Sequence, residues 1–406
     1  MNIQTLKNMY HLVKADIANA YYQKPSDQMK VIGVTGTDGK TTTSSLIYHI
    51  LKSAGKKVSL ISTVSATIGK KSYDTGFHVT TPSPFTVQKY LRQAADDGDE
   101  YFVLETTSHG LDQYRVFGVH FSIGLITNVT HEHLQYHKTY ENYVKAKARL
   151  LEWSDLGIMN TDDKSYEYLS KLKLKKRITY GLKNKADVSI DISQKLQQHL
   201  AGFNKYNYLG AYVVCHELGI ADTDIYAAMK TFTLPPGRLE VVYDKDYKVI
   251  IDFAHTPNAL HEALQSIRVV HKPKGRIVHL FGAAAFRDDS KRPLMGDESA
   301  SHADTTIITE EDYRTEDPNQ IADQIAVGMK KNKWKFISAE SYTGEPKTFT
   351  SIVNRQEAIE KSLSIAKKGD IIVLTGKGHE QSLNRNGKEY SWDDKKAVLE
   401  SIKKLG

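Results

Sequence analysis

The chain has 406 residues, of which 40% are hydrophobic and 25% are charged. This length exceeds one ordinary core and predicts two or three domains of globular composition. No apolar run approaches the ~18 residues of a membrane span, and the first residues lack a signal-peptide core, so we expect a cytoplasmic protein with no membrane partner. The one cysteine, Cys215, excludes an intrachain disulfide and a multi-cysteine zinc site.

The charge balance is mildly basic. Lys and Arg number 55 and Asp and Glu number 48, which gives a formal net charge of +7. The basic residues are spread along the chain, and their densest run, 171–180, is short. A nucleic-acid partner is not expected, because such partners need a clustered basic face. An anionic small-molecule substrate explains the excess equally well.

The N-terminal 29 residues predict one amphipathic helix followed by a polar link. Leu6, Tyr10, Val13 and Ile17 recur at helical spacing. The segment is too short to form a domain, so we expect this helix to pack against the domain that follows.

The stretch 31–45, VIGVTGTDGKTTTSS, predicts a strand, a phosphate loop and a helix. Gly36 and Gly39 would let backbone N–H groups face a polyphosphate, while the helix N-terminus and Lys40 add positive charge. The hydroxyl of Thr41 would then face Mg²⁺. The spacing G-x-x-G-K-T is shorter than the common G-x-x-x-x-G-K-[ST] pattern, and a structural turn with a surface lysine is the alternative.

Further apolar runs predict a parallel sheet. Strands are expected at 58–61, 101–104 and 123–127, with intervening helical patterns. This βαβ alternation is typical of a doubly wound α/β domain.

Ligands of such sheets collect at the carboxyl ends of the strands, where this chain carries polar clusters. Glu105 to Gly110 follows the third strand, Asn128 to His133 follows the fourth, and Thr80-Thr81-Pro82 lies in a loop. A carboxylate such as Glu105 near a triphosphate is a natural Mg²⁺ ligand. A helix is expected over 140–153, where the pattern alone favours simple solvation of Lys145 and Lys147.

Pro235-Pro236-Gly237 predicts a stiff, non-helical joint between two domains, 1–234 and 235–406. We also expect the domains to close on each other about a hinge near 235–238. Beyond the joint, four apolar strands alternate with helical patterns, which predicts a Rossmann-like α/β domain. They lie at 249–253, 277–281, 305–309 and 371–375.

Nine ordered motifs carry a resemblance to a known family. They are GTDGKTTT, TTPSP, ETTSHGLDQYRVFG, TNVTHEHLQYH, YVKAKARLL, PPGRLE, IDFAHTPNAL, KRPLMG and GKGHE. From about residue 25 to its end the chain resembles the Mur ligase family, most closely its MurE type. These are ATP-dependent amide ligases that add the third amino acid to the UDP-N-acetylmuramoyl dipeptide of peptidoglycan. ATP phosphorylates the acceptor carboxylate, and the amine of the amino acid then attacks the acyl phosphate.

The resemblance implies the following roles. ATP and two Mg²⁺ ions are the expected cofactors, and Lys147 matches a lysine that CO₂ converts to a carbamate. Nucleotide-binding positions are Gly36, Thr37, Asp38, Gly39, Lys40, Thr41, Thr42, Asn128, Arg238, Asp252 and His255. Metal ligands are Thr41, Glu105, His133 and Lys147, and the catalytic set is Lys40, Lys147, His133 and Glu105. Acceptor-binding positions are Thr80, Thr81, Ser108 and Arg115, and amino-acid-binding positions are Arg287, Arg314, Gly376 and Glu380.

The chain departs from the MurE pattern in three places. MurE-type enzymes begin with a domain that binds the uridine and sugar, whereas this chain starts almost at the phosphate loop, so a partner chain that replaces this domain is one expectation. The glycine-rich G-A-G-G-D-R-D stretch is GAAAFRDD here, at 282–289. The D-N-P-R motif is EDYR, at 311–314, which leaves the added amino acid open.

These departures leave alternatives to the MurE reaction. One is the same chemistry on an acceptor without UDP, such as a peptide, a folate-like molecule or a cofactor. A second is a non-catalytic nucleotide-binding regulator. A nucleic-acid-binding NTPase is a third and would need a salt-dependent DNA affinity.

Overall fold

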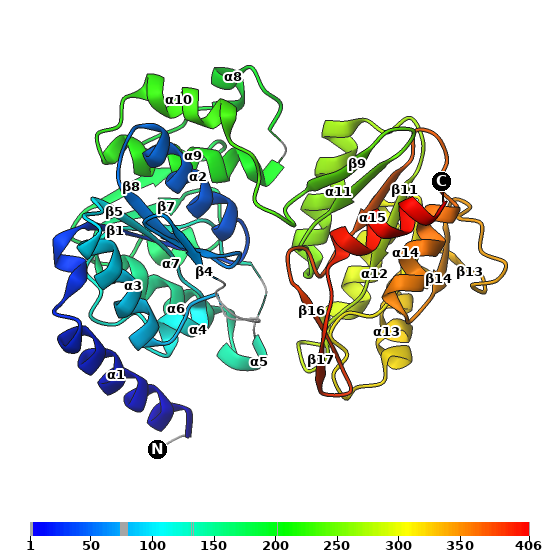
Figure 1. Ribbon diagram of the computed structural model, residues 1–406, viewed down its shortest axis with the longest axis horizontal. Coiled ribbons are helices and arrows are strands. Elements are labelled where there is room, and N and C mark those ends of the chain that lie inside the picture. The colour runs from blue at the N-terminus through cyan, green and yellow to red at the C-terminus, as the bar shows by residue number, and fades with distance from the viewer. Residues whose placement is uncertain (1–2, 74–79, 131, 133, 201, 406) are drawn as a thin grey trace. The chain divides into compact units, whose positions relative to one another are not determined.

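The computed structural model describes residues 3–73, 80–130, 132, 134–200 and 202–405. The chain divides into two compact units, Met1–Thr233 and Leu234–Gly406, which Figure 1 colours from blue to green and from green to red. Within the described part of the chain, no helix combines the length and apolar character that crossing a membrane requires.

The first unit alternates strands and helices. Its described elements are α1 (Ile3–Tyr21), the 3₁₀ helix η1 (Pro25–Gln28), β1 (Lys30–Thr35), α2 (Lys40–Ser53), β2 (Val58–Ile61), β3 (Ala66–Ile68), β4 (Lys71–Tyr73), α3 (Pro84–Asp96), β5 (Tyr101–Glu105), α4 (Ser108–Asp112), β6 (Phe121–Ile126), α5 (Leu134–His137), α6 (Tyr140–Glu152), β7 (Ser154–Asn160), α7 (Tyr166–Leu169), β8 (Arg177–Tyr180), α8 (Ile192–Leu196), α9 (Gly202–Glu217) and α10 (Asp222–Thr231).

These strands form one sheet in the order β4-β3-β2-β5-β1-β6-β7-β8. All neighbours from β2 to β8 pair in parallel, and β3 and β4 add an antiparallel edge. Helices α2, α9 and α10 bury apolar side chains on one face, and α3, α4 and α6 cover the other (Figure 1). The predicted doubly wound sheet is confirmed.

Helix α1 packs against the first unit as predicted, but not through its large apolar residues. Tyr10, Val13 and Ile17, which marked the helix as amphipathic, are 63%, 59% and 56% exposed. The helix instead buries Ala15 and Ala18 and contacts α3. Small side chains allow this close approach, whereas the spacing of large apolar residues does not show which face is covered.

The second unit is also α/β. Its described elements are β9 (Glu240–Asp244), β10 (Lys248–Ile251), α11 (Pro257–His271), β11 (Ile277–Phe281), α12 (Lys291–His302), β12 (Thr305–Ile308), α13 (Pro318–Lys331), β13 (Lys335–Phe336), β14 (Thr348–Ser351), α14 (Arg355–Ser364), β15 (Ile371–Leu374), β16 (Ser382–Arg385), β17 (Lys388–Ser391) and α15 (Asp394–Leu405).

Its main sheet has the order β13-β14-β12-β11-β15-β10-β9, and only β9 is antiparallel to its neighbour. Helices α11, α12 and α13 form a core on one face, and α14 and α15 form a core on the other. The Rossmann-like α/β prediction is confirmed. The sequence predicted the four central strands β10, β11, β12 and β15 but not β9, β13 and β14.

Candidate functional site

The turn between β1 and α2 has room for glycine only. A Cβ atom on Gly36 would lie 1.8 Å from the hydroxyl oxygen of Thr127. At Gly39 a Cβ would lie 2.1 Å from the side-chain oxygen of Asn207, and the φ angle of +80° lies in the left-handed region that favours glycine. Both glycines of the predicted phosphate loop are therefore required by the packing.

The carboxyl end of β6 holds the loop in place. The backbone N–H of Asp38 donates to the Asn128 side chain at 2.9 Å, and the hydroxyl of Thr127 donates to the Asp38 carbonyl at 2.7 Å. The side-chain oxygen of Thr37 accepts from the backbone N–H of Thr130 at 2.9 Å. Asn128, expected from the resemblance to bind nucleotide, here fixes the loop through its side chain.

Helix α2 begins directly after this loop, at Lys40. Its N-cap residue Gly39 offers no side-chain acceptor, and the amide groups of a first helical turn have no acceptor within the helix. The ammonium group of Lys40 donates to the Thr37 carbonyl at 2.7 Å, and Thr41 and Thr42 are buried in the first turn. This combination suits a phosphate group, which would accept hydrogen bonds and neutralise the positive helix end.

Glu105, at the carboxyl end of β5, lies beside α2 because β5 pairs in parallel with β1. Its side chain is fully buried. One carboxylate oxygen accepts from the hydroxyl of Thr41 at 3.1 Å and from that of Thr63 at 2.7 Å. The other accepts from the Thr63 backbone N–H at 2.9 Å. Hydroxyl and carboxylate oxygens are the ligands Mg²⁺ prefers, so Thr41 and Glu105 fit this ion.

Thr63 extends the same network toward the acceptor-binding positions. Its hydroxyl is also hydrogen-bonded to that of Thr80 at 3.0 Å. Thr41, Glu105, Thr63 and Thr80 thus form a continuous hydrogen-bonded chain from the phosphate loop to the Thr80 loop. Thr63 was not among the residues predicted from the sequence, although it lies just after the end of β2, as Glu105 lies at the end of β5.

Lys147 is buried in α6, with 1% of its surface exposed. Its side-chain nitrogen donates to the Gly36 carbonyl at 2.6 Å and lies 4.6 Å from the centre of the Tyr143 ring. Burial, and then the positive charge of Lys40, lower the pKa of Lys147 well below its usual value. The solvated lysine favoured by the sequence pattern is therefore wrong, because α6 covers the sheet on this side.

Thr81, Ser108 and Arg115 lie close together around the start of α4. The Thr107 N–H donates to the hydroxyl of Thr81 at 2.9 Å, and the Arg115 guanidinium donates to the Thr81 carbonyl at 2.9 Å. Ser108 is hydrogen-bonded to His137 at 3.0 Å. Burial lowers the pKa of Arg115. His133, predicted to bind metal, lies outside the described residues.

The nucleotide positions predicted in the second unit form a group near the end of β10. Asp252 is buried and accepts from the backbone N–H groups of Leu239 and Ala254, both at 2.8 Å. The Arg238 guanidinium lies 4.5 Å from the centre of the Phe253 ring. Burial raises the pKa of Asp252, and the charge of Arg238 opposes this rise.

His255 and the four amino-acid-binding positions also lie in the second unit. The His255 ring is hydrogen-bonded to the Phe253 carbonyl at 2.9 Å. Arg287 is exposed, and the backbone N–H of Arg314 donates to the Asn384 carbonyl at 3.0 Å.

Glu380 already has a cationic partner in this unit. Lys377, which is fully buried, lies 2.6 Å from Glu380 and 2.9 Å from Asp312. Burial lowers the pKa of Lys377, but the two carboxylates raise it by a larger amount. The net shift of this pKa is therefore upward. Gly376 and Glu380 of the GKGHE motif were predicted as site residues, but Lys377, which joins the motif to the EDYR stretch, was not.

Glu311 is a third residue, after Thr63 and Lys377, that the sequence pattern did not single out. Its side chain is buried, and one carboxylate oxygen has no hydrogen-bond partner among the described residues. A Cβ atom on Gly376 would lie 2.8 Å from that oxygen, so glycine leaves room beside it. Burial raises the pKa of Glu311, while His255, Lys377 and Lys291 act in the opposite direction. An unpaired buried carboxylate is typical of a binding site.

Comparisons with known proteins decide the family. The model of the Mur ligase middle domain matches residues 34–215, and that of the Mur ligase, glutamate ligase domain matches residues 237–378. The chain belongs to the Mur ligase family. It is an ATP-dependent, Mg²⁺-using ligase that forms amide bonds, the class of enzyme that acts in peptidoglycan synthesis.

Two curated relatives of this Mur ligase carry MurE names. It is 36% identical to UDP-N-acetylmuramoyl-L-alanyl-D-glutamate--2,6-diaminopimelate ligase 1 of Clostridium acetobutylicum, over 95% of this chain and 80% of the relative. It is 35% identical to the corresponding ligase of Aquifex aeolicus, again over 95% of this chain and 80% of the relative.

Solved structures agree on the family and the fold. A UDP-N-acetylmuramoyl-L-alanyl-D-glutamate--2,6-diaminopimelate ligase is 30% identical, with a TM-score of 0.60 over 93% of this Mur ligase and 79% of that chain. The folylpolyglutamate synthase of Mycobacterium tuberculosis is 14% identical, with a TM-score of 0.67 over 90% and 91% of the two chains. The second likeness concerns the fold alone.

Proposed function

We propose that this Mur ligase activates the terminal carboxylate of a UDP-N-acetylmuramoyl dipeptide and joins it to the amine of an amino acid. The names of its relatives support the acceptor. The observation that carries the proposal is the hydrogen-bonded chain from Thr41 through Glu105 and Thr63 to Thr80. It links phosphate-binding groups to the loop that matches the family's acceptor site, as transfer of a phosphoryl group between the two substrates requires.

The phosphate loop binds and orients the triphosphate of ATP. In this proposal the first-turn amides of α2 donate to phosphate oxygens, and Lys40 leaves the Thr37 carbonyl to balance their charge. Glycine at positions 36 and 39 keeps the backbone accessible. Within the second unit, Arg238, Asp252 and His255 bind the rest of the nucleotide.

Thr41 and Glu105 would hold one Mg²⁺ ion through oxygen atoms, and Glu105, His133 and a modified Lys147 would hold the second. Bound there, Mg²⁺ would neutralise charge on the phosphoryl group during transfer. The buried carboxylate of Glu105 is kept in one orientation by its three donors from Thr41 and Thr63.

Lys147 carries the modification. A lowered pKa leaves more of its amine neutral near pH 7, and the neutral amine is the form that attacks CO₂. The amine nitrogen bonds to the carbon of CO₂ and one proton is released, which gives an anionic carbamate. This reaction would replace a buried neutral amine beside Lys40 with an anion that suits Mg²⁺.

The acceptor binds beside this centre, and the amino acid binds to the second unit. Thr80, Thr81, Ser108 and Arg115 bind the muramoyl peptide. Arg287 and Arg314 bind the carboxylate of the amino acid, and Glu380 binds a distal ammonium group next to Lys377 and Gly376.

The test is ADP release by the purified chain with ATP and Mg²⁺. We would combine UDP-N-acetylmuramoyl-L-alanyl-D-glutamate with each of a panel of amino acids, including diaminopimelate, lysine and neutral ones. Parallel reactions would contain a free peptide or a folate as acceptor. We expect ADP release only when the UDP-linked acceptor and one class of amino acid are both present, together with a product heavier by that amino acid less water.

The other outcomes contradict parts of the proposal. Turnover with the peptide or folate and none with the UDP-linked acceptor would overturn the acceptor assignment. ATP binding without turnover on any acceptor would favour a nucleotide-binding regulator.

A further inference from the structure

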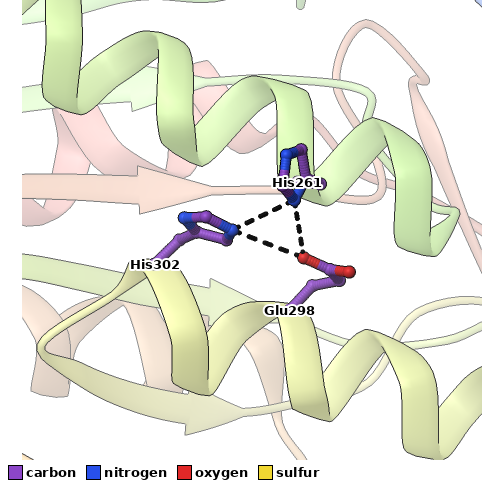
Figure 2. Close-up of side chains that lie close together, drawn as sticks. All are labelled: His261, Glu298 and His302. Carbon is purple, nitrogen blue, oxygen red and sulfur yellow. Dashed lines mark hydrogen bonds and ion pairs between the residues drawn. The ribbon is translucent and has the colours of Figure 1, made fainter.

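A cluster of two imidazoles and one carboxylate connects α11 to α12 in the second unit (Figure 2). His261 belongs to α11, and Glu298 and His302 belong to α12. Their side chains are 39%, 30% and 21% exposed, so solvent reaches them. None of these residues belongs to the proposed ligase site.

One ligand atom of each side chain converges on a common point. The Nδ1 atom of His261 lies 3.0 Å from Oε2 of Glu298 and 3.1 Å from Nε2 of His302, and the latter lies 3.5 Å from Oε2 of Glu298. Zn²⁺ binds nitrogen and oxygen ligands at about 2.0–2.1 Å, so two ligands of a tetrahedral ion lie about 3.3 Å apart. The three donor atoms already have the spacing of one face of a tetrahedral zinc site.

The helices hold these atoms in place. Glu298 and His302 are four residues apart and share one face of α12. Buried Leu264 anchors α11, and buried Met295 anchors α12, in the same apolar core. The ligands therefore need little reorganisation to bind an ion.

The charges around the cluster are compatible with a cation. Arg268 is a nearby basic residue, and it forms an ion pair with Asp304 at 3.0 Å while donating to the His302 carbonyl at 2.9 Å. Burial, and then His261, lower the pKa of His302, with Glu298 acting in the opposite direction.

We propose that His261, Glu298 and His302 form a binding site for one divalent transition-metal ion of the zinc type. Two nitrogen ligands and one oxygen ligand select Zn²⁺ or Ni²⁺ over Mg²⁺, which prefers oxygen. Three protein ligands leave the fourth position to water or an external ligand. The ion would fasten α11 to α12 and is separate from the Mg²⁺ of the ligase reaction, so the proposal does not rest on the proposed function.

The test is Zn²⁺ titration of the full chain, prepared without a polyhistidine tag and treated with a chelator. Calorimetry compares the wild type with His261→Gln, Glu298→Gln and His302→Gln. The control is His271→Gln, which changes a histidine of the same helix that lies outside the cluster. Cys215 is buried and does not compete. Circular dichroism checks that each variant is folded.

We expect one Zn²⁺ per chain, a rise in thermal midpoint on binding, and no competition from millimolar Mg²⁺. Each ligand variant should weaken binding by at least about tenfold, and the control should not. Co²⁺ in place of Zn²⁺ should give the strong visible absorption of a tetrahedral site, which the ligand variants lose. Equal Zn²⁺ affinity in the wild type and in folded ligand variants, or no binding at all, would overturn the site.

Discussion

The side-chain nitrogen of Lys147 donates a 2.6 Å hydrogen bond to the carbonyl oxygen of Gly36, which ties helix α6 to the phosphate loop inside the first unit. A lysine with this degree of burial is costly as a cation, and its pKa is lowered accordingly. The contact places the amine of Lys147 beside the loop that we propose binds the triphosphate of ATP.

Replacing Lys147 with alanine should lower the rate of ADP release by about 100-fold or more, because the anionic ligand formed from its amine is lost. Lys145→Ala is the matched control, since Lys145 is exposed on the same helix and should keep the wild-type rate. Carbon-13 NMR with labelled bicarbonate should show a carbamate signal in the wild type and in Lys145→Ala only. A fully active Lys147→Ala variant, or a wild type without the signal, would refute the carbamate.

Glu105→Gln tests the Mg²⁺ site. The amide has nearly the same shape but lacks the negative charge, and we expect the Mg²⁺ concentration for half-maximal ADP release to rise by about tenfold or more. The control is Asp99→Asn, because Asp99 is a buried carboxylate that accepts from Ser59 just before the amino end of β5. An unchanged Mg²⁺ dependence in Glu105→Gln would remove this residue from the metal site.

The sequence predicted the central strands of both sheets but not their outer strands, nor what covers each face. The central parallel strands show as apolar runs, whereas β13 has two residues and β3 and β4 have three each, too few for a periodic signal. The stripe formed by Tyr10, Val13 and Ile17 predicted the helix α1 correctly and its buried face wrongly. Periodicity identifies an apolar side, and tertiary contacts decide whether that side is covered.

In the candidate site too, some residues could be predicted from the local sequence and others only from the fold. Lys40 and Glu105 could be predicted because a phosphate loop and a strand end each have a local signature. Thr63 has the second signature, but a lone threonine in a loop carries little information. Asp312 and Glu380, the two partners of Lys377, are far from each other in the sequence. Only the fold shows that both contact this lysine.

Gly39→Ala should lower the ATP affinity of the phosphate loop by more than the backbone strain of a positive φ angle alone would. Gly39 and Gly55 have similar φ angles, +80° and +74°, so alanine at either position costs about 1 kcal/mol of stability. At Gly39 the new Cβ would also meet Asn207, whereas at Gly55 nothing lies within 4 Å. We therefore expect calorimetry to show ATP affinity reduced about tenfold or more in Gly39→Ala and unchanged in Gly55→Ala. Equal affinities would mean that the loop adapts.

His279 offers a test of the second unit by pH. Its ring is fully buried in β11 and hydrogen-bonded to the hydroxyl groups of Ser299 at 2.8 Å and Thr375 at 3.0 Å. Burial, with a further contribution from Arg355, lowers the pKa of His279 to about 3. The unfolded chain binds a proton near the ordinary pKa of 6.5 and the folded chain does not, so acidification below that value favours unfolding.

Between pH 7 and pH 5 this group should remove about 2 kcal/mol from the free energy of unfolding of the wild type, and nothing from that of His279→Gln. The loss of stability on acidification should therefore be smaller in the variant, even if the variant is less stable at pH 7. Urea unfolding can be followed in a Trp153→Phe background, where fluorescence comes from Trp334 and Trp392 of the second unit. If the free energy of unfolding fell equally with pH in the wild type and in His279→Gln, the prediction would be wrong. The native His279 ring would then accept a proton as easily as the unfolded one.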